Sequence, residues 1–274
     1  FEQQLRWVED DSNSDLALDR NYLRREVLPL LEQRWPAYRN SVMQSVEAVS
    51  EAEAALAEQE IPVLKEASGQ HFGEPTLDLE YFRGCTAQRL CRLLRFWLRS
   101  LGLEPPGRAQ LEEFVRQLQT AESEKAPELL CHSYHLCRYQ DYVYVHAPLP
   151  PLDFFAEQEL RPGEALELAP AAVLEARRES GAGLKLPAAG AWQVRYRQGG
   201  ERCQPAGREH SQSLKKLLQD YQVPPWWRPR LPLIYAGEEL VAVANLWVCE
   251  GYTAAADEES CVLDWQLNFT PLPD

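Results

Sequence analysis

Several common features are missing from this sequence of 274 residues, and each absence excludes a class of protein. No run of 18 or more uncharged apolar residues and no charged-then-apolar leader occurs, so we expect neither a membrane-spanning helix nor a signal segment. The seven cysteines are odd in number and contain no CxxC pair, which indicates free thiols in a reducing cytoplasm. The only methionine is Met43 and the first residue is Phe1, so we expect the whole protein to have a further N-terminal portion.

Sequence motifs of nucleotide-dependent and hydrolytic enzymes are also absent. There is no GxxxxGK[ST] phosphate loop, no GxGxxG after a strand, no HExxH and no GxSxG. We therefore expect no catalytic residue and no bound cofactor in this chain.

One cluster of soft ligands deserves comparison with a zinc site, the stretch CHSYHLC at residues 131–137. If this stretch is a strand, Cys131, His135 and Cys137 share one face. Zinc would need a fourth ligand from elsewhere, and closed zinc sites normally show paired short spacings. We favour the alternative, a strand in a reducing cell, and predict no metal site.

The N-terminal half is expected to be mostly helical. From Ser41 to Glu60 apolar residues recur at helical spacing, while five glutamates and no basic residue occupy the remainder. A Gly/Pro-containing turn region is expected at 68–75, and a further helix at 108–119. An alternating stretch rich in Tyr and Val predicts a β-hairpin that turns near Gln140–Asp141.

The C-terminal half has the pattern of short strands around one helix. The proline-rich stretch APLPPLD (147–153) is the best linker candidate. Beyond it, short strands surround the helical stretch SLKKLLQDYQ, with Ser211 or Ser213 as its cap. The fold class predicted is therefore α+β and multidomain. The domains expected are the end of a preceding domain with a connecting helix (1–38), a mostly helical domain (39–147) and a small mixed α/β domain (148–274).

Four arginines occupy one face of a predicted amphipathic helix that ends near Gly102. Arg89, Arg92, Arg95 and Arg99 lie opposite an arc of leucines and Trp97, and no acidic residue occurs between Cys85 and Leu103. The helix therefore has no i,i+4 acidic partners to offset the repulsion of like charges. The face is either an ordinary solvated surface or a contact for an external anion such as phosphate.

A second basic region lies between Arg195 and Arg230. It holds eight Lys/Arg and three acidic residues, a local net charge of +5 in a chain whose net charge is −14. Gly199 and Gly200 indicate a tight turn, and Lys215 and Lys216 fall in the first turn of a helix, where cations oppose the macrodipole. The plain alternative is a turn followed by buried tryptophans. We favour a phosphate-facing surface, with outward backbone N–H groups beside the two lysines.

Two stretches together resemble one family, the bacterial tRNA(Ile)-lysidine synthetases. WVEDDSNSDLALDRNYLRREVLPLL resembles the segment that closes the catalytic domain of that family, although Asp11 stands where many members have proline. The positions that match this motif are Asp10, Ser12, Asn13, Arg20, Asn21 and Arg24. The stretch from VRYRQGGER to ANLWV resembles the C-terminal domain of the family along its whole length.

The resemblance implies a cytoplasmic ligase that uses ATP and Mg²⁺ to adenylate the wobble cytidine of the AUA-reading isoleucine tRNA, after which lysine displaces AMP. In the family this chemistry belongs to an N-terminal domain with a Ser-Gly-Gly-x-Asp-Ser loop, which these 274 residues lack. The chain alone is thus expected to be inactive and to bind the tRNA body and acceptor stem. The tRNA contacts expected are Arg89, Arg92, Arg95, Arg197, Arg202, Lys215, Lys216, Arg228 and Arg230.

Two other readings of the sequence stay open. The chain could be a non-catalytic scaffold whose acidic helix (41–60) and basic region bind a protein partner or a second copy in a homodimer. It could also be an RNA-binding module with no enzymatic parent. Salt-sensitive binding to tRNA separates the scaffold from the other two.

Overall fold

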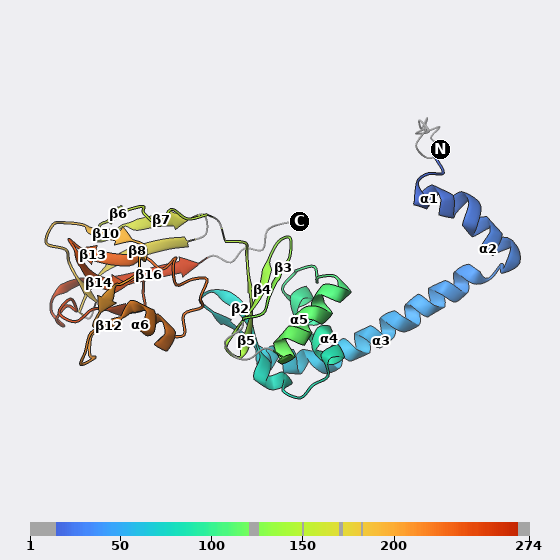
Figure 1. Ribbon diagram of the computed structural model, residues 1–274, viewed down its shortest axis with the longest axis horizontal. Helices are drawn as coiled ribbons and strands as arrows, with labels where there is room; N and C mark the ends of the chain where they lie inside the picture. Colours follow the sequence, from blue (N-terminus) through green and yellow to red (C-terminus); the bar gives the residue numbers. More distant parts are fainter. Residues whose placement is uncertain (1–14, 121–125, 150, 170–171, 182, 268–274) are drawn as a thin grey trace, which may run out of the picture. The chain divides into compact units, whose positions relative to one another are not determined.

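The computed structural model describes residues 15–120, 126–149, 151–169, 172–181 and 183–267 (Figure 1). The chain divides into two compact units, Phe1–Pro62 and Val63–Asp274. Among the described residues, no helix combines the length and the apolarity that crossing a bilayer requires. Each of the seven cysteines is a free thiol.

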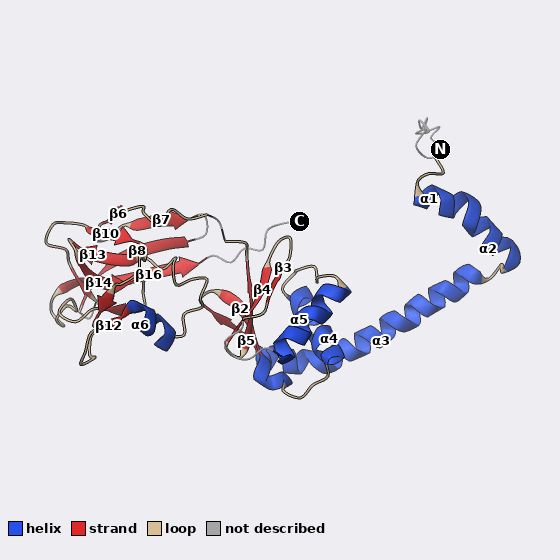
Figure 2. Ribbon diagram, in the orientation of Figure 1, coloured by secondary structure: helices blue, strands red, loops and turns tan. Residues whose placement is uncertain are grey.

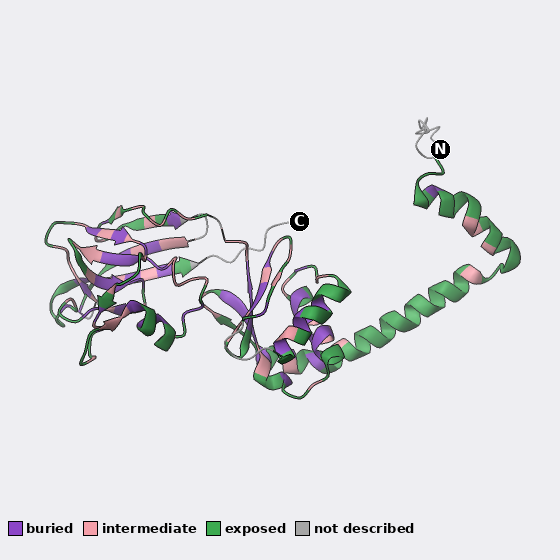
Figure 3. Cartoon of the chain, in the orientation of Figure 1, coloured by how far each residue is buried: buried purple, intermediate pink, exposed green. Residues whose placement is uncertain are grey.

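The first unit is helical in the part that the structure describes. Its elements are α1 (Asp19–Tyr22), the π-helical turn η2 (Leu23–Val27), α2 (Leu28–Arg34) and most of α3 (Tyr38–Ala67). The helix predicted at 41–60 is confirmed as part of α3. Its apolar stripe is exposed, as Figure 3 shows for most of the length of α3. The exposed members of that stripe are Val42, Val46, Val49 and Leu56.

The second unit begins with a sheet that the sequence did not predict in full. Its strands are β1 (Ser68–His71), β2 (Glu74–Asp78), β3 (Glu128–Leu130), β4 (His135–Tyr139) and β5 (Tyr142–His146), in the antiparallel order β1-β2-β5-β4-β3. The hairpin turning at Gln140–Asp141 is confirmed. Residues 39–147 therefore carry a five-stranded sheet beside their helices, rather than helices and one hairpin.

The turn region expected at 68–75 is wrong, because that stretch forms the hairpin of β1 and β2. The turn itself is confined to Phe72 and Gly73, whose φ angles are 52° and 74°. Proline lacks the N–H that a strand with neighbours on both sides would need. Pro75 is tolerated in β2 because at this position β2 pairs only with β1, through Gln70, and its pairing with β5 starts at Thr76. Gly and Pro in this stretch mark the hairpin turn and its edge.

Two helices cover this sheet and build the first hydrophobic core (Figure 2). They are α4 (Ala87–Ser100) and α5 (Arg108–Thr120), joined to β2 by the 3₁₀ turn η3 (Leu79–Phe82). Thr86 caps α4, since its hydroxyl accepts from the Arg89 N–H at 3.3 Å. The apolar arc predicted for α4 is confirmed as its buried face, with Trp97 only 2% exposed.

In its described residues, the rest of the second unit contains three antiparallel sheets and one helix. The sheets have the orders β15-β14-β13-β10-β6, β7-β8-β16-β9 and β11-β12. Their strands are β6 (Gln158–Leu160), β7 (Ala165–Ala169), β8 (Ala172–Ser180), β9 (Leu184–Lys185), β10 (Trp192–Arg195), β11 (Arg202–Cys203), β12 (Gln212–Ser213), β13 (Leu233–Ala236), β14 (Glu239–Val243), β15 (Trp247–Val248) and β16 (Glu259–Leu267). The predicted helix is α6 (Leu214–Asp220), and Ser213 is its cap. The α+β class is confirmed.

Candidate nucleic-acid interface

Strand pairing brings the cations of the C-terminal basic region together. Arg202 of β11 lies opposite Ser213 of β12, and Ser213 directly precedes α6. The guanidinium of Arg202 donates to the Ser211 carbonyl at 2.9 Å, which holds the side chain along this short ladder. Lys215 and Lys216 follow in the first turn of α6, and all three cations are exposed. We call Arg202, Lys215 and Lys216 the α6 basic surface.

The lysines of this surface point away from a well-packed helix face. Leu214, Leu217 and Leu218 of α6 are fully buried in the C-terminal core. Among the described residues neither lysine makes an ion pair. The expectation of outward backbone N–H groups is wrong for two of the three amides of the first turn, since the Leu214 N–H donates to the Glu201 carbonyl at 2.9 Å and the Lys216 N–H to Ser213 Oγ at 3.4 Å. The two ammonium groups are therefore the main groups of this turn that an external anion could contact.

Other cations of the basic region are compensated within the protein. Gly199 and Gly200 both have positive φ, 100° and 88°, and the chain bends at Gly199, although β10 and β11 on either side do not pair as a hairpin. The Glu201 carboxylate accepts from the Gly199 N–H at 2.7 Å and lies 3.7 Å from Arg197 Nε. Arg208 lies 3.6 Å from the carboxylate of Asp220. The region therefore contains internal ion pairs beside the α6 basic surface.

The tryptophan-containing segment after α6 contacts the first sheet of the same unit. Arg228 Nε donates to the Val223 carbonyl at 2.9 Å, and its Nη2 donates to the Tyr139 hydroxyl at 3.0 Å. Trp226 Nε1 donates to the Glu74 carboxylate, 3.0 Å from Oε2. Arg230 is half-buried, and burial lowers the pKa of its guanidinium. Arg228 and Trp226 thus have internal partners, which the sequence did not indicate.

Glu74 is the group near this contact that sequence reasoning missed. Its side chain lies on β2 and the residue is 2% exposed. Burial raises the pKa of its carboxyl to about 8, even though the hydrogen bond from Trp226 favours the charged form. A lone glutamate before a proline carries no sequence signal for such an environment.

We expect Glu74 to make the second unit less stable as the pH rises. A carboxyl whose folded pKa is raised stabilises the fold fully below its unfolded pKa near 4.5, and that contribution is lost as pH rises through about 8. His71 and His146 face the same contact, and burial lowers the pKa of both. Relative to Glu74→Gln, the wild type should therefore lose up to about 1.4 kcal/mol per pH unit between pH 6.5 and 8. Urea unfolding at a series of pH values measures this difference. If the free energy of unfolding of the wild type and of Glu74→Gln changed with pH in parallel, the prediction would be contradicted.

The arginines of α4 lie where the sequence placed them, opposite the buried face. Arg89 and Arg99 are exposed, whereas Arg92 and Arg95 are half-buried. Among the described residues of α4 no acidic side chain occurs, while α5 carries its own ion pairs, such as Arg108 with Glu112 at 2.7 Å. We call these four arginines the α4 basic face.

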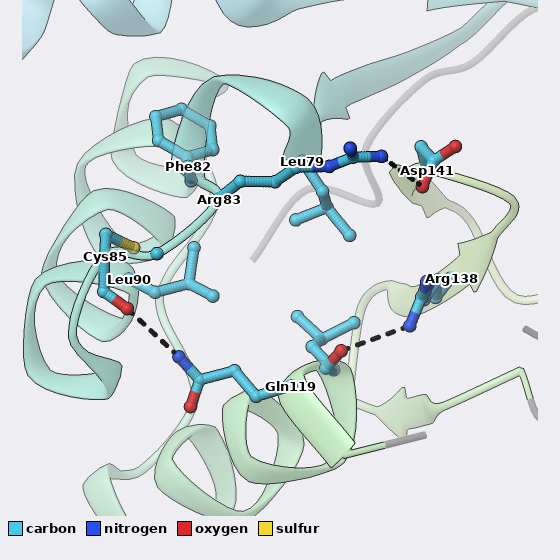
Figure 4. A pocket seen from close by; sticks show the side chains of 10 residues that line it. Leu79, Phe82, Arg83, Cys85, Leu90, Gln119, Arg138 and Asp141 are labelled. Atoms are coloured by element: carbon cyan, nitrogen blue, oxygen red, sulfur yellow. Dashed lines mark hydrogen bonds and ion pairs between the residues drawn. The ribbon is translucent and has the colours of Figure 1, made fainter. Parts of the chain in front are cut away.

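A pocket of about 340 Å³ lies beside α4 (Figure 4). Its wall includes Arg138, whose Nη1 donates to the Leu118 carbonyl at 3.1 Å, and Gln119, whose amide donates to the Cys85 carbonyl at 3.3 Å. Arg83 and Asp141 lie 3.9 Å apart at its rim. Each of these polar side chains thus has a partner within the chain. We assign no ligand to the pocket.

The candidate zinc ligands do not share a strand face. Cys131 lies in the turn before β4, because its N–H donates to the Tyr134 carbonyl at 2.9 Å, whereas His135 and Cys137 lie on β4. Cys137 Sγ is 3.4 Å from His146 Nε2, and His135 Nδ1 is 3.8 Å from Glu128. In the part of the chain that the structure describes, no three His, Cys, Asp or Glu side chains form a metal-binding group.

The motif near the N-terminus is described only in part. Asp10, Ser12 and Asn13 lie outside the described residues. Asn21 is buried, and its side-chain amide donates to the Asp15 carbonyl at 2.9 Å. Arg20 and Arg24 are exposed.

Comparison with known families and proteins defines the class of this chain. Residues 77–144 match the family model described as the TilS substrate binding domain, and residues 192–265 match the TilS substrate C-terminal domain. The chain thus contains a substrate-binding domain and a C-terminal domain of one family. It belongs to the tRNA(Ile)-lysidine synthase family.

Similar proteins named tRNA(Ile)-lysidine synthase extend beyond the length of this chain. The protein of Coxiella burnetii is 34% identical over 97% of this chain, which covers 58% of that protein. The protein of Alkalilimnicola ehrlichii is 35% identical over 90% of this chain and 55% of its own length. The protein of Yersinia pseudotuberculosis is 31% identical over 96% of this chain and 60% of its own length. The chain therefore spans somewhat under three fifths of two of these relatives, and 60% of the third.

Proposed function

We propose that this chain is the tRNA-recognition part of a cytoplasmic tRNA(Ile)-lysidine synthase, and that it binds the body and acceptor stem of isoleucine tRNA. The whole protein would ligate lysine onto the wobble cytidine through an adenylated intermediate, with ATP and Mg²⁺ bound outside these residues. Family membership supports this proposal, as does the absence of a Ser-Gly-Gly-x-Asp-Ser loop from the 274 residues. The chain alone would bind tRNA without completing the ligation.

The observation that carries the proposal is the α6 basic surface. Three exposed cations lie on one short ladder and the helix turn that follows it, in a chain of net charge −14. A double-stranded RNA stem is recognised mainly through its shape, phosphates and 2′-hydroxyls. An isolated positive surface on an acidic body attracts a polyanion to one place and repels it elsewhere. We propose that Arg202, Lys215 and Lys216 contact tRNA phosphates directly.

The remaining predicted contacts lie in two places, on α4 and in the C-terminal basic region outside the α6 basic surface. The α4 basic face offers a second, separate set of guanidinium groups, and we propose that it also contacts the tRNA backbone. Arg197 and Arg228 already have partners in Glu201 and Tyr139, so their contribution to tRNA binding would come with rearrangement of those contacts. We further propose the domain division 1–38, 39–147 and 148–274, because the two family matches lie inside the second and third of these ranges.

Reversal of charge on the α4 basic face tests this second surface. Arg95→Glu should lower the affinity for isoleucine tRNA about tenfold, and the slope of log affinity against log salt concentration by about one. Arg177→Glu is the matched control, since Arg177 is an exposed arginine on β8. Fluorescence anisotropy at several salt concentrations measures both quantities. Equal affinities and slopes for the two variants would remove α4 from the interface.

One observation favours the scaffold as a second candidate. Val42, Val46 and Val49 of α3 are exposed along a stretch, 41–60, that carries five glutamates, which is the composition of a protein-binding helix face. On this alternative the α6 basic surface would bind protein and be indifferent to tRNA. A titration with isoleucine tRNA that shows no salt-sensitive binding would favour the scaffold.

A further inference from the structure

Two parts of the second unit that are far apart in sequence anchor one another in both directions. From the C-terminal part, the Trp226 ring packs among aromatic residues of the first sheet, stacked on His146 at 5.2 Å and edge-on to Tyr144 at 5.2 Å. From the first sheet, Phe72 at the tip of the β1–β2 hairpin packs against the C-terminal core. The contact is therefore reciprocal.

Polar contacts make this junction specific. The Trp226 N–H lies 3.0 and 3.2 Å from the two carboxylate oxygens of Glu74, which is almost completely buried. Loss of the indole would leave a buried carboxyl without this donor, and an unsatisfied buried polar group is costly. Arg228 adds a second tie through the Tyr139 hydroxyl and lies over the Tyr139 ring at 5.6 Å.

The covalent connection between the same parts does not fix their orientation by itself. The chain passes from β5 to β6 through residues 147–157, which include the proline-rich stretch 147–153. Two binding surfaces joined only by such a segment act as tethered modules, and binding the second one costs ordering free energy. Surfaces held at a fixed spacing avoid that cost.

We propose that Trp226 and Glu74 are positioning residues that hold the α4 basic face and the α6 basic surface at a fixed spacing for one tRNA. The Trp226 indole is consequently a structural anchor and not a platform for base stacking. The inference rests on the proposed function, since it concerns how the two proposed tRNA surfaces are coordinated. Neither residue contacts the tRNA itself.

The decisive variant is Trp226→Ala, compared with Trp226→Phe, which keeps an aromatic ring but lacks the N–H donor. Without RNA, Trp226→Ala should increase the rate of limited proteolysis in segment 147–153 and the radius of gyration measured by small-angle scattering. Its affinity for isoleucine tRNA should fall about tenfold while the salt slope stays that of the wild type, because the phosphate contacts are still made. For Trp226→Phe, the proteolysis rate, the radius of gyration and the affinity for tRNA should lie between those of the wild type and those of Trp226→Ala.

A second variant keeps the test decisive if Trp226→Ala does not fold. Trp226→Phe/Tyr139→Phe removes both polar ties and keeps an aromatic ring at each position, so its core should remain intact. Two outcomes would overturn the positioning role. In the first, this variant has the same proteolysis rate and radius of gyration as the wild type. In the second, both quantities rise, which shows that the two parts have separated, but the affinity for tRNA is unchanged. A wild-type chain that binds no tRNA would overturn the proposed function, and the RNA-free measurements would still decide whether Trp226 docks the two parts.

Discussion

Lys215→Glu/Lys216→Glu is expected to lower the affinity of the chain for isoleucine tRNA on the order of 100-fold at about 0.1 M salt. Both lysines are exposed on the first turn of α6, while the leucines beside them are buried, so the substitutions should leave the core intact. Each lost phosphate contact releases one fewer counterion, and the salt slope should fall by about two. Glutamates at the first turn also suit the helix dipole, so the variant should be no less stable than the wild type.

The matched control for this variant is Arg161→Glu/Arg177→Glu. Both arginines are exposed in the same C-terminal part but lie outside the α6 basic surface. The control changes the net charge by the same amount, so it separates a local contact from general attraction between charged bodies. Anisotropy titrations across a salt series give the affinity and the slope for both. An equal loss in the two variants would mean that α6 is no specific contact.

Trp97→Ala is expected to lower the free energy of unfolding of the second unit by about 3–5 kcal/mol. The Trp97 side chain is 2% exposed and lies in the core shared by α4, α5 and the first sheet. Its removal deletes a large buried apolar surface and leaves a cavity that the neighbouring leucines fill only in part. Since the same helix carries the α4 basic face, the loss should also weaken the binding of tRNA through that face.

Trp35→Ala is the control for the substitution of Trp97. Trp35 is 58% exposed, so the same chemical change there should alter the free energy of unfolding by less than about 1 kcal/mol. Urea unfolding followed by circular dichroism measures both variants. A Trp97→Ala protein as stable as Trp35→Ala would show that α4 is not anchored by its buried arc.

Local patterns were sufficient to predict the two helices that carry the proposed site, α4 and α6, but not the β11–β12 ladder that holds Arg202. The apolar spacing of α4 predicts its buried face because helical periodicity places every third or fourth residue on one side. The serines before α6 predict its start because a hydroxyl there can accept a backbone N–H of the first turn, and the structure shows that Ser213 rather than Ser211 does so. Paired glycines predict the change of chain direction at Gly199 and Gly200 because glycine readily adopts the positive φ that both residues have.

Prediction failed where the determining partner is distant in sequence. The hairpin at 68–78 is stabilised by pairing with β5, which lies about 70 residues further along, so its Gly and Pro residues alone indicated only a turn. Two of the N–H groups expected to be free at α6, those of Leu214 and Lys216, donate to Glu201 and Ser213, and the Glu201 contact depends on how the preceding loop folds.

By itself, the sequence determined the charge distribution, the helices and turns around the two basic surfaces, and the resemblance to the family. These depend on composition and on spacings of a few residues. Only the tertiary structure decided which cations stay exposed and which, like Arg197 and Arg228, contact other residues of the chain. It also decided that Trp226 donates to Glu74, 152 residues away. Such contacts follow from the packing of whole sheets, which no short pattern encodes.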